Sequence, residues 1–261
     1  MQELFNLSGK RVLITGGTHG LGMAMAKGLA NAGAELIING HSPDKMEVAL
    51  DHYKQAGYKA SGYLFDVTQQ EVVRESISKI EQERGAIDIL INNAGIIKRI
   101  PAIDMDAQDF RSVIDVDLVA PFIVSKEVAR HMIKRRAGKI INICSMMSEL
   151  GRNTVSAYAA AKGGLKMLTK NLATEWAPHN IQVNGIGPGY FATEQTAPIR
   201  VDGHPFNEFI VNRTPAGRWG DPDDLAGTAV FLSSKASDFV NGQIIYVDGG
   251  ILATIGKPSN E

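Results

Sequence analysis

The chain has 261 residues, of which 44% are hydrophobic and 21% charged, as is typical of a globular protein. Its 27 basic and 28 acidic side chains give a net charge of −1, which argues against a nucleic-acid-binding surface. The single cysteine, Cys144, excludes an intrachain disulfide and a multi-cysteine metal cluster, and we expect no metal site. We find no signal peptide and no apolar stretch of about 18 residues, so we expect a cytoplasmic protein that does not associate with a membrane.

Short apolar runs alternate with helix-like segments along the whole chain. We predict strands over residues 11–15, 35–39, 60–65, 87–92, 139–144, 181–186 and 243–247. We predict helices over residues 21–32, 43–56, 68–84, 107–135, 156–175 and 222–233. The third helix is expected to begin with Thr68 and Glu71 as a capping box, and the fourth to break near Ala120 and Pro121. Continuous apolar strands that alternate with helices are typical of the α/β class, in which helices cover both faces of a parallel sheet.

One stretch interrupts this alternation. Residues 189–221 contain Pro198, Pro205 and Pro215 and show no clear period. In an α/β protein such a segment commonly covers a ligand site, so we expect a substrate lid there. Since the alternation is otherwise unbroken, we predict a single domain over residues 1–261 that both binds a ligand and carries the reacting groups.

A glycine cluster lies between the first predicted strand and the first predicted helix. From Thr15 to Gly22 it reads TGGTHGLG, so the glycines follow the spacing G-x-x-x-G-x-G. Glycine lets the backbone turn tightly and lets phosphate oxygens approach, and the helix that follows supplies unpaired N–H groups. The pattern predicts a dinucleotide phosphate site, and the alternative is a tight turn without a ligand.

Ser145, Tyr158 and Lys162 form a second candidate group. Tyr158 and Lys162 stand four residues apart on a predicted helix, so their side chains share one face. An ammonium group beside a phenol favours the phenolate, which suits Tyr158 to act as a general acid or base. Ser145 ends a predicted strand, where its hydroxyl can donate a hydrogen bond to a substrate oxygen. The alternative is that Tyr158 and Lys162 are only a surface pair.

Six ordered motifs make the chain resemble the short-chain dehydrogenase/reductase family over nearly its whole length. The resemblance implies an oxidoreductase with a nicotinamide cofactor, a doubly wound (Rossmann) seven-stranded parallel sheet with helices on both faces, and commonly a homotetramer. The six motifs are the glycine cluster, Asn92-Asn93-Ala94-Gly95, Ser145 thirteen residues before Tyr158, Tyr158-x-x-x-Lys162, Asn184-x-x-x-Pro188-Gly189 and Val247-Asp248-Gly249-Gly250.

The resemblance also implies roles for individual residues. Tyr158 would transfer the proton, Lys162 would bind the nicotinamide ribose, and Ser145 would hydrogen-bond the reacting oxygen. The residues expected along the cofactor are Gly16, Thr18, His19, Gly20, Leu21, Gly22, His41, Asp66, Val67, Asn93, Ala94, Gly95, Tyr158, Lys162, Pro188, Gly189 and Thr193.

One position departs from the family pattern. Asp117 stands where the family usually has an asparagine that completes a proton relay with the lysine and a water. We count Asp117 among the catalytic candidates, because an aspartate can also shape the helix and hold a water. Its charge would compete for the Lys162 ammonium, which leaves the four-residue relay open. A catalytically silent nucleotide-binding sensor remains the alternative from a different functional class.

The end of the second predicted strand indicates which nicotinamide cofactor is used. NAD-dependent relatives usually carry an acidic residue there, which would repel a 2′-phosphate. This chain has Asn39-Gly40-His41 instead, with His19 in the glycine cluster nearby. A histidine can pair with a phosphate, so we predict NADP. The alternative is that both histidines are exposed loop residues and NAD serves.

The loops beside the expected nicotinamide site are polar and basic, which favours a sugar acid over a steroid or an acyl chain. Arg99 is the first candidate for a carboxylate and Arg152 the second, while Ser148 and Glu149 suit hydroxyl groups. With Ser145 and Tyr158 these complete the expected substrate residues. The alternative for both arginines is a solvated loop charge.

Residues 140–152, 156–171, 185–193, 215–220 and 247–253 resemble the gluconate 5-dehydrogenase branch of the family. This resemblance implies the reversible NADP-linked reduction of 5-keto-D-gluconate to D-gluconate. The alternatives are a 2-keto-3-deoxygluconate 5-dehydrogenase and another short-chain carbonyl reductase, such as a 3-ketoacyl reductase.

Overall fold

Seven parallel strands form one sheet in the order β3-β2-β1-β4-β5-β6-β7 in the computed structural model, which describes residues 2–256. The predicted doubly wound parallel sheet is confirmed. Strand order reverses between β1 and β4, and in such sheets ligands bind beyond the carboxyl ends of the strands at this point. The strands are β1 (Arg11–Thr15), β2 (Glu35–Gly40), β3 (Ala60–Leu64), β4 (Ile89–Asn92), β5 (Gly138–Ile143), β6 (Ile181–Pro188) and β7 (Ile244–Val247).

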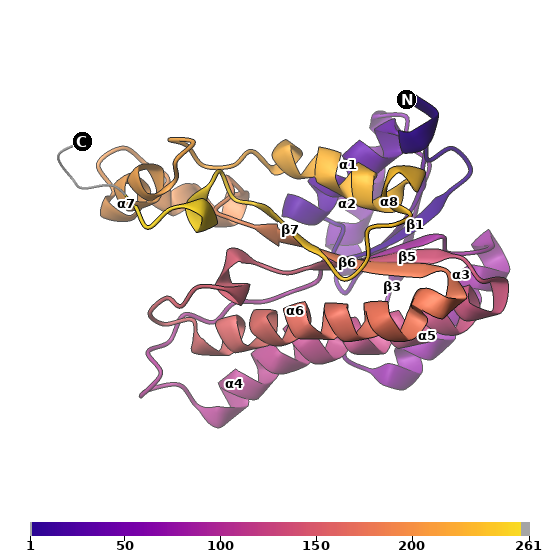
Figure 1. The fold of residues 1–261 in the computed structure, drawn as a ribbon, viewed down its shortest axis with the longest axis horizontal. Helices are drawn as coiled ribbons and strands as arrows, with labels where there is room; N and C mark the ends of the chain where they lie inside the picture. Colours follow the sequence, from indigo (N-terminus) through magenta and orange to yellow (C-terminus); the bar gives the residue numbers. More distant parts are fainter. Residues whose placement is uncertain (1, 257–261) are drawn as a thin grey trace.

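Helices cover both faces of the sheet, as Figure 1 shows. One layer contains α1, α2 and α8, and the opposite layer contains α3, α5 and α6. The helices are α1 (Gly20–Asn31), α2 (Pro43–Gln55), α3 (Gln70–Arg84), α4 (Ala107–Ile114), α5 (Ala120–Arg135), α6 (Ser156–Trp176), α7 (Pro205–Arg213) and α8 (Ala226–Ser233). No helix within residues 2–256 is long and apolar enough to cross a membrane.

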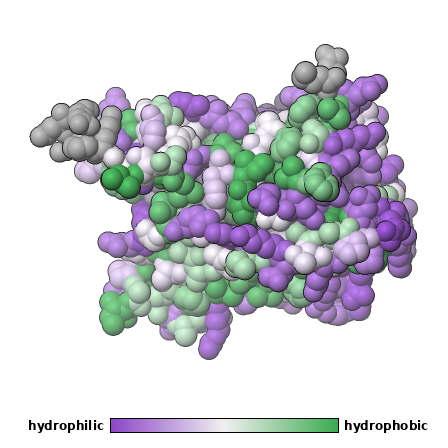
Figure 2. All heavy atoms as spheres, viewed as in Figure 1, coloured by the Kyte–Doolittle hydropathy of each residue, from purple (hydrophilic) through white to green (hydrophobic). Residues whose placement is uncertain are grey.

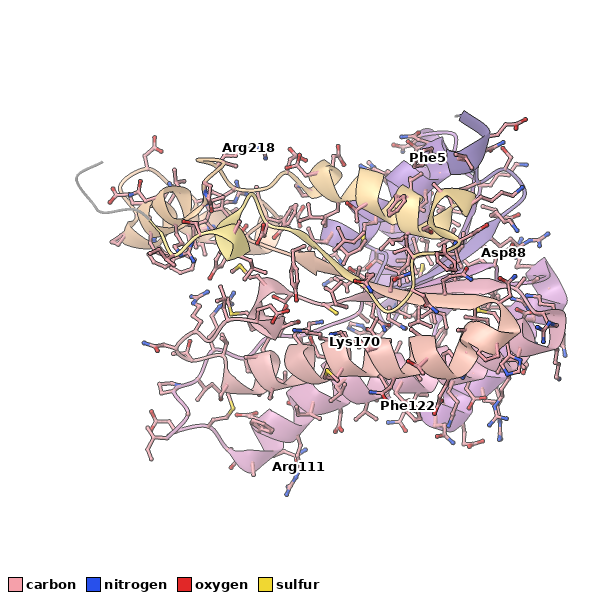
Figure 3. All side chains as sticks on the ribbon, in the orientation of Figure 1. Phe5, Asp88, Arg111, Phe122, Lys170 and Arg218 are labelled. Carbon is pink, nitrogen blue, oxygen red and sulfur yellow. The ribbon has the colours of Figure 1, made fainter. Side chains whose placement is uncertain are left out.

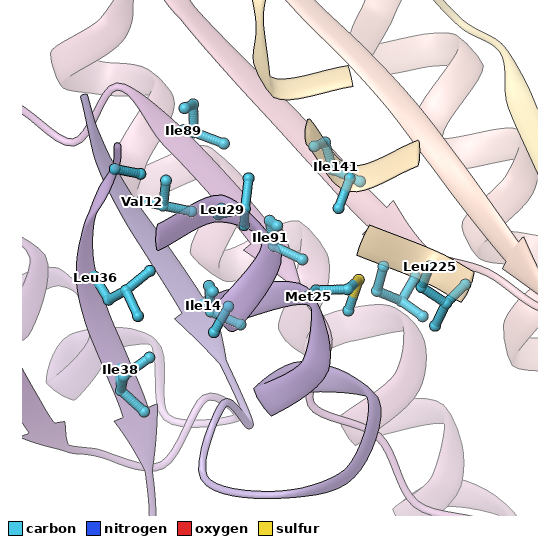
Figure 4. Close-up of a cluster of buried hydrophobic side chains, with 14 of the residues drawn as sticks. Val12, Ile14, Met25, Leu29, Leu36, Ile38, Ile89, Ile91, Ile141 and Leu225 are labelled. Carbon is cyan, nitrogen blue, oxygen red and sulfur yellow. The ribbon is translucent and has the colours of Figure 1, made fainter. Parts of the chain in front are cut away.

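Alternate residues of each central strand enter different hydrophobic clusters. On β1, Val12 and Ile14 pack beneath α1, whereas Leu13 packs against the opposite helix layer. Figure 4 shows Val12 and Ile14 with their neighbours in the first cluster. Full burial of such a side chain contributes about 1.5–3 kcal/mol. Since both faces are buried, the central strands are mostly apolar at successive positions, and the sheet is a rigid base for the loops at its carboxyl edge.

Two predicted features take a different form in the structure. The capping box at Thr68 is wrong, because the Thr68 hydroxyl donates to Asp66 Oδ1 at 2.7 Å and α3 begins two residues later. The predicted helix over residues 107–135 is continuous in path, but α4 and α5 are joined by a π-helical turn, η2 (Asp115–Val119). This turn precedes the predicted break at Ala120 and carries Asp117.

The segment over residues 189–221 contains a 3₁₀ helix, η5 (Glu194–Ile199), and the short helix α7. Its ends are tied together where Phe191 and Gly220 form an isolated parallel bridge. In Figure 1, α7 lies at the left end of the molecule, above the layer that contains α4 and α6.

Candidate active site

The glycine cluster forms a tight turn between β1 and α1. Gly16 has a φ of +63°, which favours glycine, and Asn93 Nδ2 donates to its carbonyl oxygen at 2.9 Å. A Cβ on Gly22 would lie only 2.5 Å from that oxygen and from Asn93 Nδ2. The Tyr53 hydroxyl donates to Gly17 O at 2.7 Å from beneath. The turn therefore requires glycine at both positions, and Asn93 acts as its support.

The first turn of α1 has no side-chain cap. His19 occupies the N-cap position in an extended conformation, and its ring nitrogen Nδ1 lies 3.0 Å from Thr18 Oγ1. By contrast, Ser42 caps α2 by accepting from the Lys45 N–H. The first N–H groups of α1 are thus left for an external acceptor, as in a phosphate site.

The end of β2 carries no carboxylate. The Asn39 amide is buried and donates to Phe65 O at 2.9 Å, so it is turned into the sheet. Gly40 adds no side chain, and His41 after it is exposed. Across the sheet edge, Asp66 is exposed, and its Oδ1 accepts from the Thr68 N–H and hydroxyl.

Ser145 caps a short 3₁₀ helix, η3 (Met146–Ser148), directly after β5. Its Oγ accepts from the Met147 N–H at 3.1 Å, while its hydroxyl hydrogen has no acceptor among the described residues. Ser148 Oγ accepts from the Ser145 N–H and donates to Lys162 O at 2.9 Å. The Ser148 hydroxyl thus fastens the Ser145 turn to α6 and has one lone pair left for a substrate.

Lys162 is buried beside Tyr158 on α6, as their spacing of four residues predicts. Its Nζ donates to Ile143 O at 2.9 Å and lies 5.5 Å from the centre of the Tyr158 ring. It also pairs with Asp117 Oδ2 at 3.1 Å. Tyr158 packs on Ala157 and Ala161 with its ring half-buried. The structure therefore brings Ser145, Tyr158, Lys162 and Asp117 together at the carboxyl edge of the sheet.

Asp117 is fully buried, at 0% exposure, on the π-helical turn η2. Its Oδ1 accepts from the Ile96 N–H at 2.7 Å, which ties it to the loop after β4. A Cβ on Gly95 would lie 2.9 Å from its Oδ2, so glycine leaves room for the carboxylate. Burial raises the pKa of the Asp117 carboxyl. Burial acts to lower the pKa of Lys162, but Asp117, Tyr158 and Cys144 together outweigh it and leave this pKa above its usual value.

The predicted substrate residues lie on different loops and differ in how exposed they are. Arg99 is exposed on the loop after β4, and Arg152 is half-buried on the loop before α6. A backbone hydrogen bond of 2.9 Å from Ile100 N to Thr154 O joins these two loops. Glu149 is exposed and accepts from Lys166 at 2.5 Å and from the Tyr246 hydroxyl at 2.6 Å, and the Lys166 hydrogen bond lowers its pKa.

Pro188 and Gly189 end β6 beside the last strand. Gly189 N donates to Val247 O at 2.9 Å, and a Cβ on Gly189 would lie 2.7 Å from Asp248 Cα. Thr193 precedes η5, and its N–H donates to Thr196 Oγ1 at 3.0 Å. Val67 and Ala94 line a small void with Thr15.

The segment over residues 189–221 contains an aromatic cluster that was not predicted from the sequence. The rings of Tyr190 and Phe206 meet edge to face at 5.7 Å, and those of Tyr190 and Trp219 at 5.8 Å. Arg152 stacks on this cluster. The only signal in the sequence is the number of aromatic residues in the segment over 189–221, because their mutual contact depends on the path of α7.

Comparison with known proteins places the chain among dehydrogenases. Residues 10–203 match the family model described as short chain dehydrogenase. The chain is 70% identical over 260 residues to a 2-dehydro-3-deoxy-D-gluconate 5-dehydrogenase of Formosa agariphila, covering 99% of this chain and 98% of that protein. It is 50% identical to a 5-keto-D-gluconate 5-reductase of Escherichia coli, covering 98% and 100%.

A solved structure is similar over nearly the whole chain. It is a gluconate 5-dehydrogenase from Burkholderia cenocepacia in complex with NADP and tartrate. Its TM-score is 0.93 at 46% identity, covering 97% of this chain and 99% of that one.

Proposed function

The chain belongs to the short-chain dehydrogenase family and is an oxidoreductase that acts on CH–OH groups, and from this premise we propose that it catalyses the reversible NADP-linked reduction of 5-keto-D-gluconate to D-gluconate. The observation that carries the proposal is the buried Lys162 ammonium, held by Asp117 and placed beneath Tyr158 at the same sheet edge as Ser145.

The glycine turn and the uncapped start of α1 support a pyrophosphate site. The close approach of Gly22 to the Gly16 carbonyl leaves no room for a side chain where a phosphate must come near the backbone. We expect the cofactor to extend from this turn past Asn93, Ala94 and Gly95 toward Thr193. When bound, its nicotinamide ring supplies the hydride for reduction or accepts it in oxidation.

The preference for NADP rests on the end of β2. With Asn39 turned inward and Gly40 lacking a side chain, no carboxylate opposes a 2′-phosphate. We assign His41 and His19 as its donors. The Burkholderia cenocepacia relative, which was solved with NADP, supports the choice of NADP as the cofactor.

The chain's own side chains handle the proton. Tyr158 donates it to the carbonyl oxygen during reduction and removes it from the hydroxyl during oxidation. The free hydroxyl hydrogen of Ser145 donates to the same oxygen, which is worth about 3–4 kcal/mol when the donor is preorganised. The Lys162 ammonium lies beside the Tyr158 ring, and Asp117 keeps that ammonium in place.

A second substrate has equal support. The relative from Formosa agariphila, 70% identical, is a 2-dehydro-3-deoxy-D-gluconate 5-dehydrogenase. Both candidate reactions occur at C5 of a six-carbon sugar acid, so the same proton-handling residues serve either one. We assign Arg99 and Arg152 to the acid group, with Ser148 and Glu149 near the hydroxyl groups, under the segment over residues 189–221 as a lid.

We also propose that four copies assemble. Among the described residues, Phe122 on α5 and Met167 on α6 expose large apolar side chains, and Figure 2 shows hydrophobic groups along the lower half of this face. Light scattering should give a mass of about four chains of 28.1 kDa; a monomer in solution would contradict this.

The test of the proposed activity is the consumption of NADPH and NADH with three compounds. These are 5-keto-D-gluconate, the 5-keto form of 2-dehydro-3-deoxy-D-gluconate, and an acetoacetyl thioester. We expect a lower KM for NADPH and turnover with a sugar acid, whereas turnover with the thioester alone would overturn the proposal. Tyr158→Phe should abolish turnover and leave the Kd of NADPH unchanged.

A further inference from the structure

The Arg152 guanidinium lies over aromatic rings from the segment over residues 189–221. Its central carbon lies 4.4 Å from the centre of the Phe206 ring and 5.9 Å from that of Tyr190. Its Nη1 donates to the Tyr190 hydroxyl at 3.2 Å. Trp219 supports the cluster, and its Nε1 donates to Asn207 at 2.7 Å. The guanidinium is therefore held by two residues, Tyr190 and Phe206, that are distant from Arg152 in the sequence.

The edge of this guanidinium remains available. A guanidinium has five N–H donors, and Arg152 uses one of them in the hydrogen bonds of residues 2–256. No carboxylate within those residues pairs with it, whereas Arg218 is paired with Asp224 and Arg200 donates to Thr193 and Thr196. A buried face and an unpaired edge are the arrangement that binds a planar carboxylate through two parallel hydrogen bonds.

Arg152 lies on the loop between two of the reacting groups. It lies seven residues after Ser145 and six before Tyr158, on the loop that joins η3 to α6. Its aromatic partners follow β6 and begin α7, so they belong to the opposite wall of the same end of the sheet. Arg152 thus belongs to the loop between Ser145 and Tyr158 and contacts the proposed lid through Tyr190 and Phe206.

We propose that Arg152 binds the carboxylate of the sugar acid, and that Phe206 and Tyr190 orient its guanidinium for this contact. The inference rests on the proposed function and deepens it, because it assigns acid recognition to a residue that also holds α7. Substrate binding and the position of α7 are then coupled through a single side chain. Arg99, which is exposed and has no aromatic support among the described residues, is left with a lesser contribution.

The experiment compares an acid substrate with its uncharged counterpart, D-gluconate with D-gluconamide, in NADP reduction. Arg152→Met should lower kcat/KM for D-gluconate by about 10- to 100-fold through the loss of a charge-assisted pair, and should lower that for D-gluconamide much less, because only a neutral hydrogen bond is lost. Arg152→Lys keeps the charge but loses the planar fork, so it should recover only part of the loss. Arg111→Met is the matched control, since Arg111 is exposed and projects from α4 away from the molecule (Figure 3).

The aromatic support has its own variants. Phe206→Leu keeps an apolar side chain but removes the ring. It should lower kcat/KM for D-gluconate by about threefold or more and lower kcat/KM for D-gluconamide less. Equal losses for acid and amide in Arg152→Met, or full activity of Arg152→Lys, would overturn the inference. Failure of the proposed function appears differently, as wild-type protein without turnover of either sugar acid. In that case the Kd of D-gluconate in the presence of NADP is measured by calorimetry for the wild type and Arg152→Met. The inference about Arg152 requires a higher Kd in Arg152→Met, and an equal Kd would overturn it.

Discussion

The Asp117→Asn variant tests the electrostatics beneath Tyr158, because it removes one charge and keeps the shape. An asparagine still accepts from the Ile96 N–H, but Lys162 loses its counterion. Two unit charges 3.1 Å apart attract each other by about 5 kcal/mol at an effective dielectric constant of about 20. Since both side chains are at most 5% exposed, the lone ammonium is not rehydrated. We expect a loss of about 3–5 kcal/mol in the free energy of unfolding at neutral pH.

The assay is urea denaturation of wild type and variant, followed by circular dichroism. Asp115→Asn is the matched control, because Asp115 is exposed on the same π-helical turn and has no ion pair among the described residues. It should change stability by no more than about 0.5 kcal/mol. If Asp117→Asn behaves like Asp115→Asn, the reasoning about the buried pair is refuted.

The same variant should shift the dependence of activity on pH. In the wild type the charges around Lys162, with that of Asp117 the largest, keep its pKa above its usual value. The ion pair therefore stabilises the fold at pH values below the usual pKa of a lysine. This stabilisation is lost as the pH rises through the pKa of Lys162 in the folded protein. In Asp117→Asn the largest opposing charge is gone, so burial lowers the pKa of Lys162 relative to the wild type. The alkaline limb of kcat should therefore move to lower pH. This prediction assigns the alkaline limb of kcat to the deprotonation of the Lys162 ammonium. If the limb does not move in Asp117→Asn, that assignment is contradicted.

Three further predictions concern the turn, the thiol and the core. Gly22→Ala should cost about 1–3 kcal/mol of stability and weaken NADPH binding in a fluorescence titration, whereas Gly163→Ala, with open space around its Cβ position, should do neither; equal effects would contradict the steric argument. Burial raises the pKa of the Cys144 thiol to about 11, so iodoacetamide should alkylate it slowly in the folded protein at mildly alkaline pH and quickly in urea, and equal rates would show that the thiol is accessible. Ile91→Ala should cost about 2–5 kcal/mol in denaturation experiments, while Val48→Ala, 70% exposed, should be nearly neutral, and a small loss at Ile91 would contradict its place in the core.

The sheet was predictable because both of its faces are buried. The central strands are apolar at successive positions, as Val12, Leu13 and Ile14 of β1 illustrate. The ends of the strands were less predictable. β4 begins at Ile89 rather than residue 87, because the Asp88 side chain accepts from the Arg11 N–H at 3.0 Å.

The chemistry of the site was predictable where it depends on spacing along one element. Tyr158 and Lys162 share a face of α6 for that reason. Contacts between distant segments were not predictable. The π-helical turn that aims Asp117 at Lys162 and the stacking of Arg152 on Phe206 both depend on tertiary packing. The capping box at Thr68 was wrong because Gln69 is the N-cap of α3, so Thr68 precedes the cap, and its hydroxyl and N–H donate to Asp66 instead.

The most direct test of the central claim is the rate of NADPH consumption by the purified protein with 5-keto-D-gluconate, for wild type and Tyr158→Phe side by side. The same two proteins are assayed with the 5-keto form of 2-dehydro-3-deoxy-D-gluconate. We predict that the wild type consumes NADPH with at least one of these sugar acids and that Tyr158→Phe binds NADPH equally well without consuming it. Equal rates in the two proteins, or no consumption by the wild type with either sugar acid, would contradict the account.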